Sequence, residues 1–357
     1  MRRCTKCVMP ETWEGITFDE QGVCSICRQN EIKNTRVNWQ QRGKTLREIC
    51  EKYKNIAEYQ GDKFDCLVPF SGGKDSAYTL WVLKKTHGMS PLAYTYNNGA
   101  FTPEGWDNLI NIPKKLDCAH LIFSPSHSLV KKLCIEATRL LGDFCWHCNT
   151  GIVASSLRMA IQWKIPLIVW GEPSVEYITS GQYTYKDMQK LNEESFKTMC
   201  QGGLPTGEFV GKQGITQRDM DIYTFPSVTE IGGAKIFSIY LGNYEPWDPR
   251  KQVELIKREL GWKERDVEGS YLRYDKTDCE YIGVRDYQKY LKRGLGRSCS
   301  LSSIDVRNGR MSREEALKII AEYDGKRPHS LDKWLEEMGM TEDEFLRETR
   351  KHAVLTI

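Results

Sequence analysis

Short apolar runs that favour β-strands alternate, from residue 64 onward, with stretches whose apolar residues recur at helical spacing. The strand-like runs are FDCLVPF, PLAYTYN, AHLIFSP, IPLIVWGE and, over 235–244, KIFSIYLGNY. Because repeated strand-then-helix order requires crossover connections, it predicts an α/β fold with a doubly wound parallel sheet. Ligands of such sheets bind at the carboxyl ends of the strands, so the residues that follow these runs are the first candidates for a functional site.

Cysteines punctuate the first thirty residues, where periodic apolar positions are few. The spacing C-x2-C-x16-C-x2-C is typical of a zinc ribbon, in which two knuckles bring four thiolates to one tetrahedral ion. The predicted ligands are Cys4, Cys7, Cys24 and Cys27. A closed four-thiolate site is structural rather than catalytic, and an iron–sulfur cluster, which uses the same ligand type, is the alternative.

The chain has 357 residues, 13 cysteines and a formal net charge of only +3. The sequence has no recognisable secretory signal and no apolar run long enough to span a membrane, so we expect a cytoplasmic protein. In that reducing compartment its cysteines are better explained by metal binding or chemistry than by disulfides. The small net charge gives no strong field for nucleic acid, which makes a zinc-dependent nucleic-acid-binding module the least favoured of three hypotheses.

These patterns divide the chain into three parts. We expect a zinc-ribbon module with a linking helix over 1–60, an α/β domain over 61–260 and a basic helical region over 261–357. Residues 180–222, rich in Gly, Gln, Thr and Lys, indicate an insertion over the surface of the α/β domain. Within the last part, Ser312-Arg313-Glu314-Glu315 predicts a capping box that opens a helix.

The first predicted strand runs directly into the segment Ser71-Gly72-Gly73-Lys74-Asp75-Ser76, which we call the SGGKDS turn. Glycines at a strand-to-helix turn let backbone N–H groups converge, and the start of the helix adds its own unpaired N–H groups and positive dipole end. The turn is therefore predicted to bind an anion, most naturally phosphate. The pattern GxxxxGK[ST] is absent, so it is not a kinase-type phosphate loop.

The SGGKDS turn resembles the PP-loop of the ATP pyrophosphatases, enzymes that cleave ATP between its α and β phosphates and attach AMP to a substrate oxygen. The resemblance implies a pyrophosphate cradle made of Ser71, Gly72, Gly73 and Ser76. It also implies that Lys74 neutralises the pyrophosphate and that Asp75 helps to place Mg²⁺. Asn97 and Asn98, which end the next predicted strand, are implied to lie near adenine or ribose.

Adenylation makes AMP the leaving group on an amide-like or carboxyl carbon, so that ammonia or sulfide can attack it. Positive charge from magnesium and lysine stabilises the departing pyrophosphate. Glu172 follows a predicted strand, where a carboxylate could bind Mg²⁺ or accept a proton from attacking ammonia. The alternative for Glu172 is an ordinary exposed loop residue.

A second cysteine pair lies in GDFCWHCNTG, over 142–151, where the third strand–helix unit should face the nucleotide. Cys145 and Cys148 could be metal ligands, redox thiols or a sulfur carrier, with His147 as a base. The alternative is a pair that packs at a helix start while Asn149 and Gly151 shape a turn for AMP. Thiolases of tRNA in the PP-loop superfamily carry a CxxC near this point, so sulfur transfer is the second hypothesis.

A resemblance also extends over nearly the whole chain. In order, the matching stretches are CTKCVMPETWEGITFDEQGVCSIC, SGGKDS, CWHCNTG, VWGEPSVEY, YLGNYEPWDPRKQVELIKRELGW, YDKTDCEYIGVRDYQKYLKRGLGR and IDVRNGRMSREEAL. Together they resemble the N-acetyl sugar amidotransferases of bacterial surface-polysaccharide and nonulosonic-acid biosynthesis. The resemblance implies an ATP-dependent conversion of an acetamido group to an acetamidino group, which is the first hypothesis.

The same resemblance implies partners. Ammonia would come from a separate glutaminase subunit, often accompanied by a cyclase-like protein. Met1 is followed by Arg2 rather than by the nucleophilic cysteine of built-in glutaminase domains, so we expect nitrogen to be imported. Whether the chain forms a homodimer is left open by the sequence.

Basic residues near the carboxyl end are candidates for binding the substrate. Residues 292–297, KRGLGR, predict a flexible loop with three cations, suited to a sugar-nucleotide diphosphate or an anionic sugar. The candidates are Arg293 and Arg297 in this loop, and Arg307 and Arg310 beside a predicted turn at Asn308-Gly309. The alternative is a solvated basic surface. Weaker candidates, which could simply close a domain contact, are Asp248, Arg250, Tyr274 and Asp275.

Overall fold

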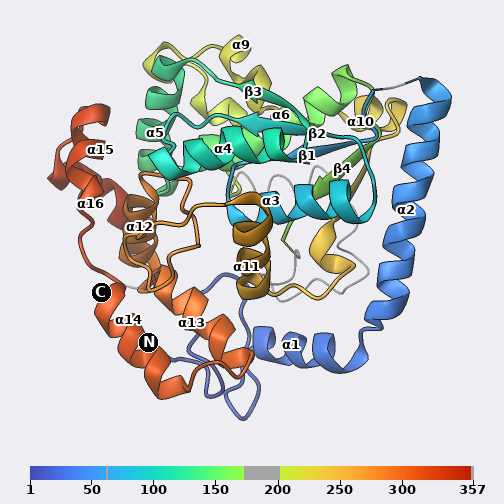
Figure 1. Ribbon diagram of the computed structural model, residues 1–357. Coiled ribbons are helices and arrows are strands. Elements are labelled where there is room, and N and C mark those ends of the chain that lie inside the picture. Colours follow the sequence, from blue (N-terminus) through green and yellow to red (C-terminus); the bar gives the residue numbers. More distant parts are fainter. Residues whose placement is uncertain (62, 173–201, 355–357) are drawn as a thin grey trace.

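The computed structural model describes residues 1–61, 63–172 and 202–354, and its centre is a five-stranded sheet (Figure 1). All neighbouring strands are parallel, in the order β3-β2-β1-β4-β5. The strands are β1 (Cys66–Pro69), β2 (Pro91–Tyr96), β3 (Ala119–Phe123), β4 (Leu167–Trp170) and β5 (Phe237–Tyr240). The predicted parallel α/β fold is confirmed, and each of the five strand-like runs contains one strand.

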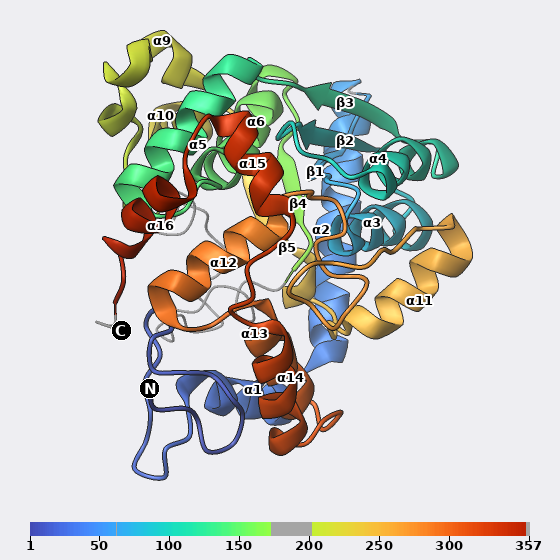
Figure 2. The same cartoon turned by 90° about the vertical axis from the view of Figure 1, so that its left-hand side faces the viewer.

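Helices cover both faces of the sheet (Figure 2). One face carries α3 (Lys74–Trp81), which continues as a π-helical turn over Val82–Thr86, together with α4 (Pro103–Lys115) and α11 (Pro249–Leu260). The other carries α5 (His127–Leu141) and α6 (Trp146–Gln162). Side chains alternate between two hydrophobic clusters along β1, with Cys66 and Val68 in one and Leu67 in the other. Burial on both faces explains why the strands are continuous apolar runs.

The amino-terminal helices are α1 (Ser25–Arg36) and α2 (Trp39–Gln60). The Asn38 side chain accepts a hydrogen bond from the Gln41 backbone N–H and so caps the start of α2. The helix ends at Gly61, whose φ of 69° is left-handed. The linking helix predicted within residues 1–60 is therefore confirmed.

Between β4 and α11 the chain forms short helices. They are the 3-10 turns Thr206–Phe209, Lys212–Gly214, Asp221–Tyr223 and Leu241–Asn243, with α9 (Gln217–Met220) and α10 (Val228–Gly233). Phe209, Met220 and Tyr223 are fully buried in a cluster with Trp146 of α6. Most residues of 202–222 are exposed, and these buried side chains hold the segment against α6, so the surface insertion expected over 180–222 stays a prediction. Residues 180–201 lie outside the described residues.

The carboxyl-terminal region is helical, as predicted, with α12 (Ile282–Arg293), α13 (Arg297–Arg307), α14 (Arg313–Tyr323), α15 (Ser330–Met338) and α16 (Glu342–Arg350). The capping box between Ser312 and Glu315 is present at the start of α14. The flexible loop expected over 292–297 is instead a short connection between α12 and α13. Gly294, with a φ of 66°, ends α12 and allows the sharp turn.

The two ends of the chain pack together. Val8 and Met9 share a buried cluster with Leu295 and Ala316 of the carboxyl-terminal region. The Arg313 Nε donates hydrogen bonds to the backbone oxygens of Cys4 and Cys7, both at 3.1 Å. The division of the chain near 60 and 260 stays a prediction, but the first and third parts share one hydrophobic core.

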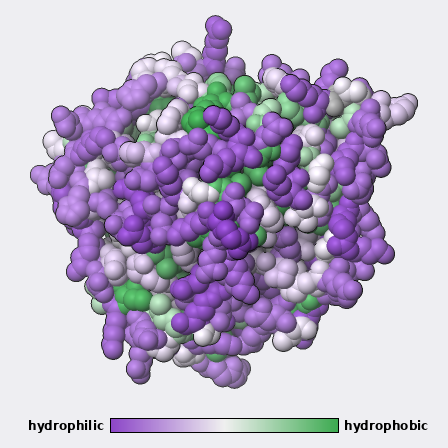
Figure 3. All heavy atoms as spheres, viewed as in Figure 1, coloured by the Kyte–Doolittle hydropathy of each residue, from purple (hydrophilic) through white to green (hydrophobic). Residues whose placement is uncertain are grey.

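The face of the molecule seen in Figure 3 is largely hydrophilic and is interrupted by small groups of hydrophobic residues. Among the described residues, none of the helices is both long and apolar enough to traverse a bilayer.

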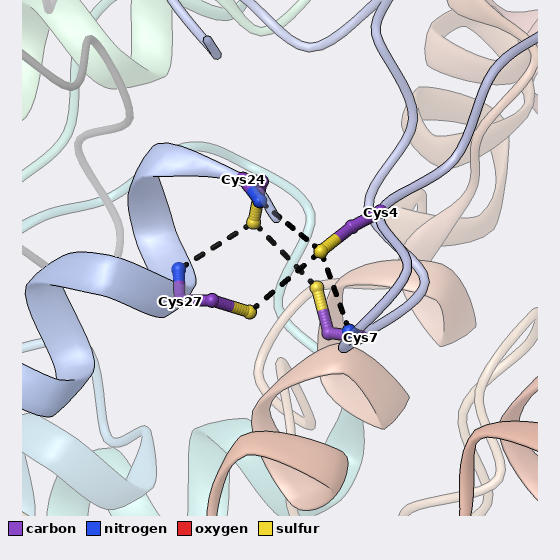
Figure 4. A group of neighbouring side chains, drawn as sticks. All are labelled: Cys4, Cys7, Cys24 and Cys27. Carbon is purple, nitrogen blue, oxygen red and sulfur yellow. Dashed lines mark hydrogen bonds between the residues drawn. The ribbon is translucent and has the colours of Figure 1, made fainter. Parts of the chain in front are cut away.

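The four amino-terminal cysteines converge, as Figure 4 shows. Their sulfur atoms all lie within 4.8 Å of one another and are buried. The Cys4–Cys27 sulfurs are 3.9 Å apart and the Cys7–Cys24 sulfurs 3.7 Å. Zinc–sulfur bonds of about 2.3 Å in a tetrahedron separate sulfurs by about 3.8 Å. The cluster therefore fits one tetrahedral ion, whereas a cluster of several irons would hold the thiolates further apart.

We predict that Cys24→Ser loses most of the bound zinc and about 4 kcal/mol or more of stability, because a closed zinc site supplies folding free energy. For a chain of this size the unfolding midpoint should fall by about 8 °C or more. The measurements are metal content by mass spectrometry and Tm by calorimetry. The matched control is Cys118→Ser, which changes a half-buried cysteine outside the cluster and should keep the zinc. Equal zinc content in both variants would contradict the assignment.

Candidate active site

The SGGKDS turn joins β1 to α3 at the carboxyl edge of the sheet, between β1 and β4, where the strand order reverses. Gly72 has a φ of 76°, and a Cβ there would lie 2.9 Å from the Gly105 backbone oxygen and 3.0 Å from the Leu109 nitrogen. Only glycine fits this position. Trp262 follows the end of α11, and its indole Nε1 donates a hydrogen bond to the Gly72 backbone oxygen at 2.9 Å. This bond holds the turn against α11.

Hydrogen bonds within the turn set its shape. The Ser71 backbone N–H donates to Ser76 Oγ at 3.3 Å, and the Gly73 N–H donates to Ser71 Oγ at 3.2 Å. Ser76 Oγ in turn donates to the Gly73 oxygen at 3.1 Å. Both serines therefore hold the backbone at the start of α3, where the helix dipole favours an anion.

Lys74 is only 4% exposed and lies between two carboxylates. Its Nζ is 2.5 Å from Asp75 Oδ2 and 3.3 Å from Asp275 Oδ1. Asp275 also pairs with Arg297 at 2.5 Å, and Arg297 pairs with Asp286 through two nitrogens, at 2.6 and 3.1 Å. Burial alone would raise the pKa of Asp275, but Lys74 and Arg297 hold it below its usual value.

Two carboxylates, Asp75 and Glu172, lie beside Lys74 in the same cavity. Burial, followed by repulsion from Asp75, raises the pKa of Glu172 to about 7. Asp75 Oδ1 is buried and receives no hydrogen bond from the described part of the chain. Two carboxylates that repel each other, one with an unsatisfied oxygen, fit the oxygen ligands that Mg²⁺ prefers. Asp75 and Glu172 are therefore the residues that could hold magnesium.

Two cavities meet at the SGGKDS turn. The smaller, about 180 Å³, is lined by Ser71, Gly73, Lys74, Asp75, Ser76 and Glu172 among others. The larger, about 330 Å³, has aromatic and apolar walls from Phe144, Tyr281, Ile282 and Trp334. They share the lining residues Ser71, Tyr96, Ile152, Lys276 and Asp278. A ligand bound on the turn can therefore reach a second molecule in the larger cavity.

Cys145 and Cys148 line the larger cavity at the start of α6. Burial raises the pKa of both thiols. His147 lies 3.2 Å from the Tyr96 hydroxyl through Nδ1, and burial lowers its pKa to about 4. At neutral pH this histidine is uncharged and both cysteines are protonated, so in this state the pair is a poor nucleophile.

Asn97, Asn98 and Gly151 have structural partners. Asn97 donates to Ser124 Oγ at 2.9 Å, and Asn98 donates to Cys148 Sγ at 3.8 Å. Both asparagines line the larger cavity, whereas a Cβ at Gly151 would lie 2.5 Å from the Tyr96 ring. Gly151 is thus needed for packing. Their contacts with a nucleotide stay a prediction.

The four candidate arginines do not converge on the SGGKDS turn. Arg293 donates to the Thr12 oxygen and pairs with Glu14. Arg310 pairs with Asp248 and Asp305, and Arg307 donates to Ser303. Among the described residues, Arg293, Arg307 and Arg310 line neither of the two cavities, and Arg297 lies in the ion chain that ends at Lys74. Their role in binding the sugar stays a prediction, but their contacts join segments of this chain.

Sequence reasoning missed Lys276, Asp278 and Cys279, which follow the weaker candidate Asp275. A Cβ at Gly105 would lie 2.6 Å from the Asp278 Cα, so Gly105 lets this segment approach the turn. The signal in the sequence was the density of charged and thiol side chains in DKTDC, which has no apolar periodicity. The positions of these residues depend on tertiary packing.

Comparisons with known proteins match parts of this architecture. Residues 268–354 match the family model of the C-terminal domain of WbpG-like lipopolysaccharide biosynthesis proteins. An uncharacterized protein of Methanocaldococcus jannaschii is 28% identical over 317 residues, which are 88% of this chain and 92% of that protein. The family model covers the segment that supplies Asp275, Lys276 and Asp278 to the site.

Two solved structures are also similar. The U34-tRNA thiolase NcsA from Methanococcus maripaludis, solved with its [4Fe-4S] cluster, aligns over 92% of this chain and 91% of its own, with 15% identity and a TM-score of 0.35. NMN synthetase from Francisella tularensis aligns over 56% of this chain and 93% of its own, with 12% identity and a TM-score of 0.30.

We predict that the affinity for a divalent cation rises with pH through about 7. Below its raised pKa, Glu172 is protonated and offers no negative charge to a metal ion. Above that pKa the carboxylate is ionised and can bind the cation. Between pH 6 and pH 8 the ionised fraction, and with it the affinity for Mn²⁺ followed by EPR, should rise about tenfold. Glu172→Gln should bind weakly and without this pH dependence.

The matched control is Glu254→Gln, an exposed carboxylate on α11, which should behave as the wild type. Wild-type affinity that does not change with pH, or an unchanged profile in Glu172→Gln, would contradict a metal-binding role for Glu172.

Proposed function

We propose that this chain is an ATP-dependent, AMP-forming amidotransferase that converts the acetamido group of a sugar or sugar nucleotide into an acetamidino group. The observation that carries the proposal is the meeting of the two cavities at the SGGKDS turn. One offers an anion site with Lys74 and two carboxylates, and the other is large enough for an acceptor. We expect the enzyme to work in the cytoplasm, where ATP is available.

In the first step, the amide oxygen of the acceptor attacks the α-phosphorus of ATP. The bond between the α-phosphorus and the oxygen that bridges to the β-phosphate breaks, and pyrophosphate leaves. Lys74 and the N–H groups at the start of α3 stabilise its growing charge. Mg²⁺, when bound by Asp75 and Glu172, would supply further charge neutralisation on the phosphates.

In the second step, ammonia attacks the adenylated carbon and AMP leaves with the former amide oxygen. The attacking nitrogen must lose a proton. A carboxylate that holds Mg²⁺ does not take this proton, so Glu172 accepts it where Asp75 alone holds the metal. Glu172 lines the cavity of the turn, and its pKa of about 7 matches a group that accepts a proton near neutral pH. A separate glutaminase subunit, with a cyclase-like companion, is the proposed source of ammonia.

The match of residues 268–354 to a lipopolysaccharide biosynthesis domain supports a sugar of a surface polysaccharide, including nonulosonic acids, as the acceptor. The walls of the larger cavity also suit such a ligand. Phe144, Tyr281 and Ile282 contribute apolar surface to these walls, and Asn98 and Arg285 contribute polar groups.

Sulfur transfer to tRNA or a small molecule is the second candidate. The observation that favours it is the position of Cys145, Cys148 and Cys279 on the wall of the larger cavity. Burial raises the pKa of all three thiols, and a thiolate is the form that attacks or carries sulfur. Because the three thiols are protonated at neutral pH, they are poor sulfur nucleophiles, and we favour ammonia as the nucleophile.

The reaction is tested by incubating the protein with ATP, magnesium, ammonium and UDP- or CMP-linked acetamido sugars. We expect AMP and pyrophosphate, and a sugar lighter by the difference between an oxygen atom and an NH group. ADP as the product would contradict the proposal. Sulfur incorporation that depends on Cys145 would instead establish the second candidate.

Lys74→Ala and Asp75→Ala should leave the protein folded, by circular dichroism, and lower the rate of AMP formation by about 100-fold or more, because the first removes positive charge at the departing pyrophosphate and the second removes a ligand of Mg²⁺. Lys114→Ala, an exposed lysine at the end of α4, is the matched control and should keep the full rate. Full activity of either Lys74→Ala or Asp75→Ala would remove the assignment of the turn as the phosphate site.

A further inference from the structure

Lys276 has a backbone conformation that lysine rarely adopts. Its φ of 58° lies in the left-handed region, where a Cβ crowds the following carbonyl. Such strain persists only where the surrounding structure imposes it, and it concentrates at functional sites. Lys276 is also one of the residues that line both cavities, so the strain occurs at their junction.

Contacts on both sides of Lys276 impose this conformation. Before it, Asp275 is held by the ion pairs to Lys74 and Arg297. After it, the Thr277 oxygen accepts a hydrogen bond from Thr102 Oγ1 at 2.6 Å, and the Asp278 oxygen accepts one from the Thr102 N–H at 3.2 Å. The contacts of Asp275, Thr277 and Asp278 therefore fix the backbone on both sides of Lys276. The side chain of Lys276 lines the two cavities.

Lys276 keeps its charge, and its ammonium group contacts no carboxylate in the described part of the chain. Burial disfavours its ammonium form, yet Glu172, Asp278 and Asp275 outweigh this effect and raise its pKa. Within the described residues its side chain makes no ion pair and donates no hydrogen bond, and the residue is exposed to the cavity. Lys74, by contrast, already contacts two carboxylates.

We infer that Lys276 is a catalytic residue whose ammonium group binds a non-bridging oxygen of the α-phosphate of ATP. The junction of the two cavities is where the acceptor must meet the nucleotide, and Lys276 is the described lysine that lines both of them. The inference rests on the proposed function, because only attack at the α-phosphorus places reacting atoms at this junction.

The step is an in-line displacement. The bond from the acceptor oxygen to the α-phosphorus forms as the bond to the bridging oxygen breaks, and the electron pair of the broken bond leaves with pyrophosphate. Negative charge grows on the non-bridging oxygens of the α-phosphate in the transition state. Lys276 stabilises that charge without giving up its proton, while Lys74 stabilises the leaving group.

The test compares Lys276→Met, Lys276→Arg and Lys276→Gly. Methionine keeps the length of the side chain without its charge, so kcat for AMP formation should fall about 100-fold or more, with a small change in the KM for ATP. Arginine should restore part of the rate. Glycine relieves the backbone strain, so this variant should be at least as thermally stable as the wild type and as inactive as the methionine variant.

Lys164→Gly and Lys235→Gly are the matched controls. These lysines have φ values of 54° and 51° and are exposed, and they precede β4 and β5 at the amino edge of the sheet, opposite the site. Both control variants should gain stability and keep the wild-type rate. Loss of activity in the controls would show that flexibility alone explains the glycine effect and would overturn the inference.

A phosphorothioate separates contact with the α-phosphate from a structural role. Wild-type enzyme should use the two diastereomers of ATPαS at different rates, because sulfur weakens the contact with Lys276 in one of them, and Lys276→Met should lose this discrimination. A wild-type rate in Lys276→Met, or unchanged discrimination, would overturn the inference while leaving the proposed function intact. Absence of AMP formation by the wild type would instead refute the proposed function, and the inference with it.

Discussion

A buried chain of alternating charges, Lys74–Asp275–Arg297–Asp286, connects the sheet to the carboxyl-terminal helices. Lys74 and Asp275 are each 4% exposed and Arg297 13%, so removal of one partner would leave a buried charge without its counterion. Such a loss typically costs about 3–5 kcal/mol. The chain of ion pairs therefore fixes where the segment 275–279 lies against the SGGKDS turn.

The site is consequently a composite of two distant parts of the chain. The α/β sheet supplies an anion site at the carboxyl end of β1 and a carboxylate after β4, as expected for a ligand at the point where strand order reverses. The carboxyl-terminal region supplies Lys276 and Asp278 and closes the larger cavity with aromatic side chains. The amino-terminal cysteine cluster packs against α13 and α14 of this region and lies away from the carboxyl edge of the sheet (Figure 1).

Local signals in the sequence predicted the parts of this architecture that depend on neighbours in the chain. Apolar runs located the strands, cysteine spacing located the four thiols that converge, and the capping box at Ser312 located the start of α14. Lys276 could not be found in this way, because its distance from Ser71 along the chain is large and only tertiary packing brings the two together. Arg297 illustrates the opposite difficulty. Its place after the two glycines of KRGLGR predicted a flexible loop, yet two carboxylates from other segments bury it at the start of a helix.

The central claim is that the acceptor oxygen attacks the α-phosphorus of a nucleotide held on the SGGKDS turn. The most direct measurement uses a sugar whose acetamido oxygen is labelled with ¹⁸O, with ATP and ammonia, and determines the label in the products by mass spectrometry. Transfer of the label to the phosphate of AMP is the predicted result. Label that remains on the sugar, or that appears in inorganic phosphate beside ADP, would contradict the account.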